Sequence, residues 1–251
     1  LCCMHAPVRA ANGLPNLGGG ADLSLGDERR LGQQVMPNLH GSSLVVEDPL
    51  LNQYLYDLWQ PVFNAAVARG DLASDMQAQF AWQLWLLNAP SINAFALPGG
   101  YIYITRGILA YLNSEAELAA VLGHEIGHVT ARHSVQQLSA ATAANVGASV
   151  LQILVPQVRN SAGDLLINTL GGALLSGYGR EHELEADRLG AEYLARTGYD
   201  PQAMIKVVGV LKNQELFDNE VAKAEGREPR RYHGLFATHP DNDTRLQEVV
   251  R

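Results

Sequence analysis

Residues 114–128 read Ser-Glu-Ala-Glu-Leu-Ala-Ala-Val-Leu-Gly-His-Glu-Ile-Gly-His. Ser114 and Glu117 have the spacing of a capping box, in which a serine hydroxyl and a glutamate carboxylate accept hydrogen bonds from the free N–H groups of a helix start. Apolar residues continue after them at three- and four-residue intervals. The stretch therefore predicts a helix over residues 115–138, with two histidines and a glutamate in its middle.

The sequence around this helix predicts a mainly helical α+β fold with a small sheet. Residues 79–105 alternate with period two between proline and glycine breaks, which is typical of two or three short strands. In the last of these strands, Ile102 and Ile104 face one side, and Tyr101 and Tyr103 face the other. Helical periodicity predicts further helices over residues 27–36, 48–68, 164–175, 180–197, 201–217 and 241–250.

The composition is that of a globular protein and limits the kinds of partner. Hydrophobic residues make up 47% and charged residues 18% of 251 residues, which fits a folded domain. The net charge is −8 and no block of lysine and arginine occurs, so we exclude nucleic-acid binding. Residues 134–158 and 165–179 are uncharged but contain many polar residues. They predict a buried helical pair rather than a transmembrane span.

The first 25 residues are predicted to form a flexible tail before a single domain over residues 26–251. The tail contains a three-glycine run and the two cysteines of the sequence, Cys2 and Cys3. A metal site downstream must therefore use histidines and carboxylates. Leu1-Cys2-Cys3 is a weak match to a lipoprotein cleavage site. It suggests a trimmed signal, a periplasmic or envelope location, a lipid anchor on an N-terminal cysteine, and association with the membrane surface or with envelope proteins.

The two histidines in the middle of the helix predict a zinc site. His124 and His128 are four residues apart, so both imidazoles lie on one face of a helix, and Glu125 lies beside them within reach of a metal-bound water. A hydrolytic zinc ion uses three protein ligands and keeps the fourth position for water. We therefore expect one Zn²⁺ per chain. The alternative is a helix that carries His, Glu and His without binding a metal.

The third ligand must come from another part of the sequence. The metzincin pattern would need Gly and His where this sequence has Ala131 and Ser134. His133 follows His128 by five residues, which turns it about 140° around a regular helix, so it is a poor ligand and fits a surface or supporting histidine better. Glu183 and Asp187 share a face of another helix. One carboxylate can bind zinc while the other accepts the ring N–H of a ligating histidine.

The chain resembles the family of zinc metallopeptidases that includes the HtpX heat-shock protease, the BepA outer-membrane-assembly protease and the CAAX prenyl endopeptidase. The resemblance spans most of the chain and rests on residues 93–96, 98–100, 124–128, 180–187 and 238–240. It implies a zincin-like, gluzincin-type domain, closest to soluble BepA-like protease domains. It also implies that zinc is bound by His124, His128 and Glu183, that Glu125 is the general base, and that Asp187 supports a ligand from behind.

The resemblance implies two further sites. Residues Asn93, Ala94 and Phe95 look like the family's edge strand, which would hold a peptide by backbone pairing. A turn between strands is the alternative for these residues. His239 is similar to a histidine that can occupy or guard the open zinc position, and a capping histidine before the next helix is the alternative.

These residues predict a zinc metalloendopeptidase whose substrate is a polypeptide, with unfolded or misassembled envelope proteins as the expected class. A further donor is expected to stabilise the oxyanion, and the candidates are His233, Tyr193, Tyr232 and Arg245. A second hypothesis is a gated, weakly proteolytic assembly factor or chaperone-like module that uses the same zinc site. A third is a helical domain whose motif binds no metal.

Overall fold

This computed structural model describes residues 23–42, 45–143, 177–226 and 245. The elements, in chain order, are α1 (Leu25–Ser42), α2 (Pro49–Arg69), α3 (Ser74–Gln79), β1 (Gln83–Leu87), β2 (Ala94–Leu97), β3 (Tyr101–Thr105), α4 (Arg106–Tyr111), α5 (Glu115–Thr130), α6 (His133–Ala143), α8 (Arg180–Thr197) and α9 (Ala203–Ala224). The α+β class predicted from the sequence is confirmed.

Local capping groups fix where the main helices begin and end. The Asp48 side chain accepts hydrogen bonds from the first turn of α2, and Pro49 occupies its first position. The Ser114 hydroxyl accepts from the N–H of Glu117 at the start of α5, and the Glu117 carboxylate accepts from the N–H of Asn113. Gly198 ends α8 with a φ of 83°, which glycine adopts without steric cost.

The three strands form a mixed sheet with β3 in the centre. β1 pairs with β3 in parallel, and β2 pairs with β3 antiparallel, so β2 is an edge strand among the described strands. The β2–β3 connection contains Gly99 and Gly100 with φ values of 82° and 85°. A Cβ at position 99 would lie 2.5 Å from the Cα of Arg29, so both the backbone angle and the close approach of α1 require glycine there.

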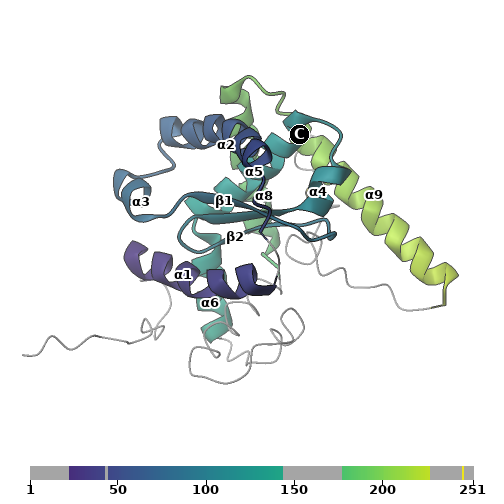
Figure 1. Ribbon diagram of the computed structural model, residues 1–251, viewed down its shortest axis with the longest axis horizontal. Helices are drawn as coiled ribbons and strands as arrows, with labels where there is room; N and C mark the ends of the chain where they lie inside the picture. Colours follow the sequence, from purple (N-terminus) through teal and green to yellow (C-terminus); the bar gives the residue numbers. More distant parts are fainter. Residues whose placement is uncertain (1–22, 43–44, 144–176, 227–244, 246–251) are drawn as a thin grey trace, which may run out of the picture.

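Helices cover both faces of this sheet, as Figure 1 shows, with α1 on one side and α2, α5 and α8 on the other. Tyr101 and Tyr103 of β3 pack in the cluster on the α1 side. Ile102 and Ile104 pack in the larger core with α2, α5 and α8. The alternation predicted for this strand is confirmed. All five residues of β3 are buried because neither face is open to solvent.

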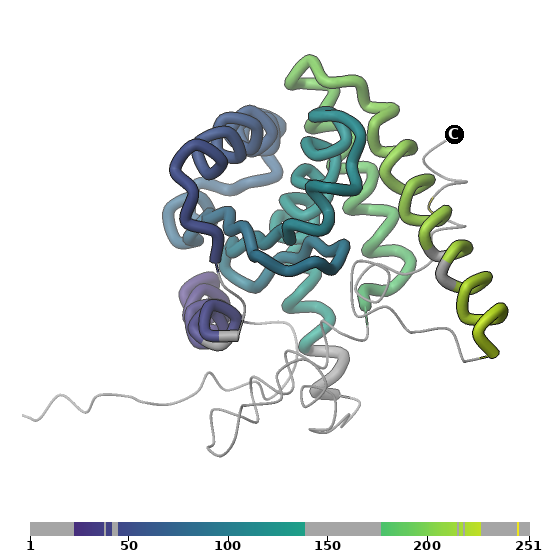
Figure 2. Tube along the Cα trace, turned by 45° about the vertical axis from the view of Figure 1, so that its right-hand side comes forward, coloured from purple at the N-terminus to yellow at the C-terminus, as the bar shows by residue number. Residues whose placement is uncertain are grey.

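Helices α5 and α8 lie side by side, and α9 packs against both (Figures 1 and 2). Glycines line their seam. A Cβ at Gly190 would lie 2.9 Å from the backbone nitrogen of His124, and a Cβ at Gly127 would lie 3.1 Å from the carbonyl oxygen of Ala186. The two helices can approach this closely because neither position carries a side chain.

One helix expected from the sequence needs correction, and several other expected segments lie outside the described residues. The helix predicted over residues 115–138 is two helices, because α5 ends at Thr130 and α6 begins at His133 after Arg132 adopts a φ of 56°. The predicted helices over residues 164–175 and 241–250, most of the uncharged pair and the tail over residues 1–22 lie outside the described residues. Among the described helices, none has the length and apolarity needed to cross a membrane.

Candidate metal centre

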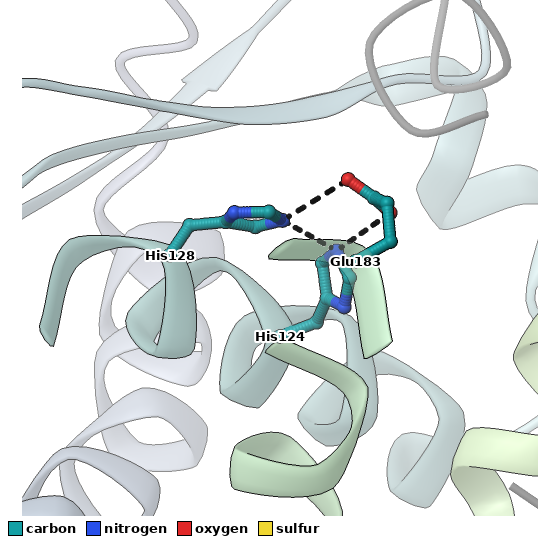
Figure 3. A group of neighbouring side chains, drawn as sticks. All are labelled: His124, His128 and Glu183. Carbon is teal, nitrogen blue, oxygen red and sulfur yellow. Dashed lines mark hydrogen bonds and ion pairs between the residues drawn. The ribbon is translucent and has the colours of Figure 1, made fainter. Parts of the chain in front are cut away.

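Three side chains from two helices meet at one point in the interior (Figure 3). His124 and His128 extend from α5, and Glu183 extends from the first turn of α8. Their exposed fractions are 4%, 0% and 0%. One donor atom from each lies within 4.8 Å of the other two. The structure therefore brings together the three ligands predicted from sequence, although Glu183 follows His124 by 59 residues and His128 by 55.

The spacing of these donor atoms fits a small divalent metal ion. The Nε2 atoms of His124 and His128 are 2.9 Å apart. The Glu183 oxygens lie 3.4 Å from Nε2 of His128 and 3.6 Å from Nε2 of His124. Ligands at roughly 2.0–2.1 Å from a tetrahedral zinc ion are about 3.3 Å apart. Two imidazole nitrogens and a carboxylate oxygen are also the donor types that such an ion prefers.

Glu125 is placed beside the ligands but outside their set. It follows His124 in α5, and its exposed fraction is 0%. Burial raises the pKa of the nearby Tyr178 hydroxyl above its ordinary range, the hydrogen bond with Ser134 lowers it in part, and the charges of Glu125, Glu183 and Glu28 make smaller raising contributions. Glu125 is therefore a buried carboxylate directly next to His124 in α5, although it does not belong to the cluster of three donor side chains.

Asp187 supports His124 from behind, as the sequence predicted for one of the two carboxylates of α8. Its Oδ1 lies 2.8 Å from Nδ1 of His124. Arg245 binds the same carboxylate through two N–H groups, at 2.8 and 2.7 Å, and its third nitrogen lies 3.2 Å from Glu183. Burial alone would raise the pKa of Asp187, but the Arg245 charge and the hydrogen bonds with Arg245 and His124 hold it below its ordinary range. Asp187 is therefore ionised at neutral pH.

Arg245 occupies a place that differs from its predicted one. The sequence suggested it as a donor to the oxyanion, whereas its guanidinium is 2% exposed and faces the two α8 carboxylates. The charge of Arg245 compensates for two acidic side chains in the interior, where an uncompensated charge is costly. Its position near the C-terminus gave no sequence signal for this pairing.

His133 supports His128, although the regular helix assumed from sequence would turn it away. Its Nδ1 lies 2.8 Å from Nδ1 of His128, and its exposed fraction is 0%. The helix break at Arg132 makes this contact possible. Burial, with the neighbouring His182, lowers the pKa of His133 to about 4, so the ring is neutral at pH 7. His133 is thus a supporting histidine, which was one of the alternatives left by the sequence.

Tyr178 is a site residue that sequence reasoning missed. Its ring stacks on the ring of His128 with centroids 4.0 Å apart, and its hydroxyl hydrogen-bonds with the Ser134 hydroxyl at 2.8 Å. The stacking fixes the plane of the His128 imidazole. Tyr178 belongs to an uncharged stretch interpreted as part of a buried helical pair, and nothing in its local sequence indicates a partner 50 residues earlier.

The other predicted site residues lie apart from the three ligands or outside the described residues. The Tyr193 hydroxyl hydrogen-bonds at 3.2 Å with Thr130, the last residue of α5, so this hydroxyl already has a hydrogen-bond partner there. Phe95 stacks on Tyr103 on the α1 side of the sheet. Predictions for His233, Tyr232 and His239 remain untested because these three residues lie outside the described residues.

Ala94 is the first residue of the edge strand β2, which packs against α5, and Asn93 directly precedes it. The Asn93 N–H donates to the Thr105 hydroxyl at 3.0 Å, and the Asn93 carbonyl accepts from the Thr105 N–H at 3.0 Å. The side-chain oxygen of Asn93 is buried without a hydrogen-bond partner in the part of the chain that the structure describes. Ala94 and Phe95 therefore lie in a strand and Asn93 directly precedes it, while the predicted role of these three residues in holding a peptide stays a prediction.

Comparison with known proteins places this geometry in a family. The profile of peptidase family M48 matches residues 61–251. The beta-barrel assembly-enhancing protease of Escherichia coli (strain K12) is 32% identical over 251 residues, covering 96% of this chain and 47% of that protein. The mitochondrial metalloendopeptidase OMA1 of Arabidopsis thaliana is 31% identical and covers 74% of this chain and 36% of that protein. The chain spans about half the length, or less, of these curated relatives.

The match and the geometry agree with each other. The matched region contains α5 and α8, and therefore all three donor side chains, Glu125 and Asp187. The resemblance inferred from the sequence is confirmed, and the matched region contains a His-His-Glu cluster that could hold a metal ion. The chain belongs to peptidase family M48.

Proposed function

We propose that the protein is a zinc metalloendopeptidase, with zinc bound by His124, His128 and Glu183. The observation that carries this proposal is the convergence of two imidazole nitrogens and one carboxylate at buried positions, with donor atoms within 4.8 Å of one another. Three protein ligands leave a fourth tetrahedral position for water, as catalytic rather than structural zinc sites require.

The residues of this chain divide the chemistry between them. When bound, zinc would lower the pKa of a water molecule and polarise the scissile carbonyl. Glu125 accepts the proton of that water and later passes it to the leaving amine, as a general base and then a general acid. Asp187 accepts the Nδ1–H of His124 at 2.8 Å and so leaves Nε2 of that ring as the ligand atom.

The edge strand β2 is the proposed binding site for the peptide backbone. Antiparallel pairing turns the N–H and C=O groups of Asn93 and Phe95 toward β3, so those of Ala94 and Ala96 point away from it. A substrate strand could pair with these outward groups. Ala94 and Ala96 are only 0% and 1% exposed, so the atoms that cover this edge must move before a peptide can pair with it.

Unfolded or misassembled proteins of the cell envelope are the proposed substrates. The support is the name of the Escherichia coli relative, which describes a protease that enhances β-barrel assembly, together with the extended-peptide site proposed on the edge strand. A periplasmic or envelope location, a lipid anchor on an N-terminal cysteine and association with the membrane surface belong to the same proposal. They rest on the Leu1-Cys2-Cys3 sequence.

The direct test is cleavage of an unfolded, casein-type substrate by purified protein with measured zinc content. We expect about one zinc per chain, because the cluster provides one set of ligands. Glu125→Gln should lower kcat by about 10²–10⁴-fold, the usual contribution of a general base, while zinc content stays the same. Glu181→Gln is the matched control, because that side chain is 81% exposed on α8. Undiminished cleavage by Glu125→Gln would refute the proposed mechanism.

A further inference from the structure

The two histidines of the metal centre are held from behind in different ways. Nδ1 of His124 meets a carboxylate, that of Asp187. Nδ1 of His128 meets another imidazole, that of His133, at 2.8 Å. The rings of His128 and His133 are nearly perpendicular, with an interplanar angle of 73° and centroids 4.9 Å apart. The 2.8 Å separation of the two Nδ1 atoms is that of a hydrogen bond.

The direction of this hydrogen bond follows from which atom binds the metal. Nε2 of His128 faces His124 and Glu183, so a metal-bound His128 carries its hydrogen on Nδ1 and donates it. Nδ1 of His133 must then accept, which places the hydrogen of His133 on Nε2. That nitrogen lies 3.3 Å from Oε2 of Glu185, a carboxylate that can only accept when ionised.

The fold builds this contact with a dedicated turn. Arg132 has a φ of 56°, which is uncommon for a residue with a side chain. Its side chain donates to the Glu28 carboxylate at 2.8 Å and to the Leu23 carbonyl at 2.6 Å. These bonds to the start of the chain's first described helix hold the turn, and the turn brings His133 back toward His128.

We propose that His133 is a positioning residue that fixes the tautomer and ring orientation of His128, with Glu185 fixing the tautomer of His133 in turn. The proposal rests on the proposed metal site. A ligand histidine whose supporting partner is removed binds its metal about 10–100-fold more weakly. Glu185 is 46% exposed, so water can replace part of its contribution, and its removal should cost less.

The sharpest test compares two amide side chains at position 133. The amide oxygen of asparagine is bonded to Cγ, as Nδ1 of histidine is, so His133→Asn keeps an acceptor facing His128. Glutamine carries its amide one bond further along, at the level of Nε2, so His133→Gln keeps the polarity and loses that acceptor. Zinc affinity is measured by competition with a chromophoric chelator, and the melting temperature of each metal-free variant shows whether the fold has changed.

The expected result is that His133→Asn keeps zinc affinity near that of the wild type, whereas His133→Gln loses about 10–100-fold. Glu181→Gln is the matched control. The Glu181 side chain is 81% exposed on the same helix as Glu185 and pairs with Arg180, so zinc affinity should not change. Nitrogen-15 spectra of histidine in the zinc-loaded protein should show the His128 hydrogen on Nδ1, and this signal should shift in His133→Gln.

Two failures can be told apart. If the wild-type protein binds no zinc, the proposed metal site is wrong and the positioning role of His133 falls with it. If the wild type binds zinc and His133→Gln binds it as tightly as His133→Asn, the positioning role alone is wrong. An equal loss of zinc affinity in both variants would also overturn the positioning role, because a hydrogen-bond acceptor at the position of the His133 Nδ1 atom would then make no difference.

Discussion

Asp187 is ionised in the interior because Arg245 neutralises it. The carboxylate accepts two hydrogen bonds from the guanidinium and one from His124, and both residues of the ion pair are almost completely buried. A buried carboxylate without such partners would take up a proton. Through its hydrogen bond with His124, the charge of Asp187 would make this imidazole a stronger ligand at the proposed metal site.

Asp187→Asn should weaken both metal binding and the fold. Zinc affinity should fall by about 10–100-fold because the partner of His124 loses its charge. The free energy of unfolding should drop by about 3 kcal/mol because Arg245 stays buried with less compensation. Urea unfolding of the metal-free protein and zinc competition measure the two effects separately. Glu181→Gln, which alters an exposed pair with Arg180, should leave stability within about 0.5 kcal/mol. Equal stability of both variants would contradict the prediction.

Glu28 should make stability depend on pH. Burial raises the pKa of Glu28 above its ordinary value, although Arg132 lowers it in part. The folded state therefore holds this proton at pH values where the unfolded state has lost it. The contribution of protonated Glu28 to the free energy of unfolding is fully present below the ordinary pKa of glutamate and is lost as pH rises through the raised pKa.

In Glu28→Gln this pH dependence should disappear. The unfolding free energy of the variant, measured relative to the wild type by urea denaturation, should rise as the pH increases from about 4.5, near the ordinary pKa of glutamate. Glu115→Gln, another acidic residue at a helix start with a less buried side chain, serves as the comparison. A difference between Glu28→Gln and the wild type that stays constant across pH would show that Glu28 has the same pKa in both states.

At the scale of elements, the metal centre depends on how closely α5 and α8 approach. The ligands come from both helices, so a shift of one helix changes the distance between Glu183 and the histidines. Gly190 sits at the closest contact, where an added Cβ would lie 2.9 Å from the His124 nitrogen and 2.6 Å from Cε of Met204. The seam glycines therefore set the geometry of the site as well as the packing.

Gly190→Ala should destabilise the protein and weaken metal binding. Overpacking typically costs about 1–3 kcal/mol, which exceeds the gain of up to about 1 kcal/mol from replacing glycine with alanine in a helix. Gly209→Ala in α9 is the matched control, because a Cβ there would meet no atom within 4 Å. That variant should be neutral or slightly more stable. Thermal unfolding with and without zinc compares the two, and a stabilised Gly190→Ala would disprove the close-contact argument.

At the scale of the whole molecule, a bound metal would link the two helices that form the centre of the core. α5 is buried along almost its whole length and packs against α2, α8, α9 and β2. An ion that binds the folded state alone stabilises it by about 4 kcal/mol at a concentration of 1,000 times its Kd. Removal of the ion should therefore lower the free energy of unfolding of the whole fold and not only alter the site.

Chelation should lower the melting temperature, and added zinc should restore it. For a protein of this size, each 1 kcal/mol corresponds to about 2–4 °C. Differential scanning calorimetry before and after treatment with a chelator measures the shift. His128→Ala lacks a ligand and should respond little to the chelator. If chelation leaves the wild-type melting temperature unchanged, the motif does not bind metal under these conditions, as the third sequence hypothesis holds.

Several features of this protein were determined by its sequence alone, because their causes are local. The helical period places His124 with His128, and Glu183 with Asp187, on single faces. The capping box predicted the start of α5, and period two assigned the faces of β3. These relations join residues at most four positions apart, so they do not depend on how the helices pack.

Only the tertiary structure decided which histidine Asp187 supports and what contacts the other ring. The pairing of Arg245 with Asp187 joins residues 58 positions apart. The stacking of Tyr178 on His128 and the contact of His133 with His128 depend on packing and on one backbone angle at Arg132. A positive φ at an arginine has no local signal, because it is held by bonds to Glu28 and Leu23 more than 100 residues earlier.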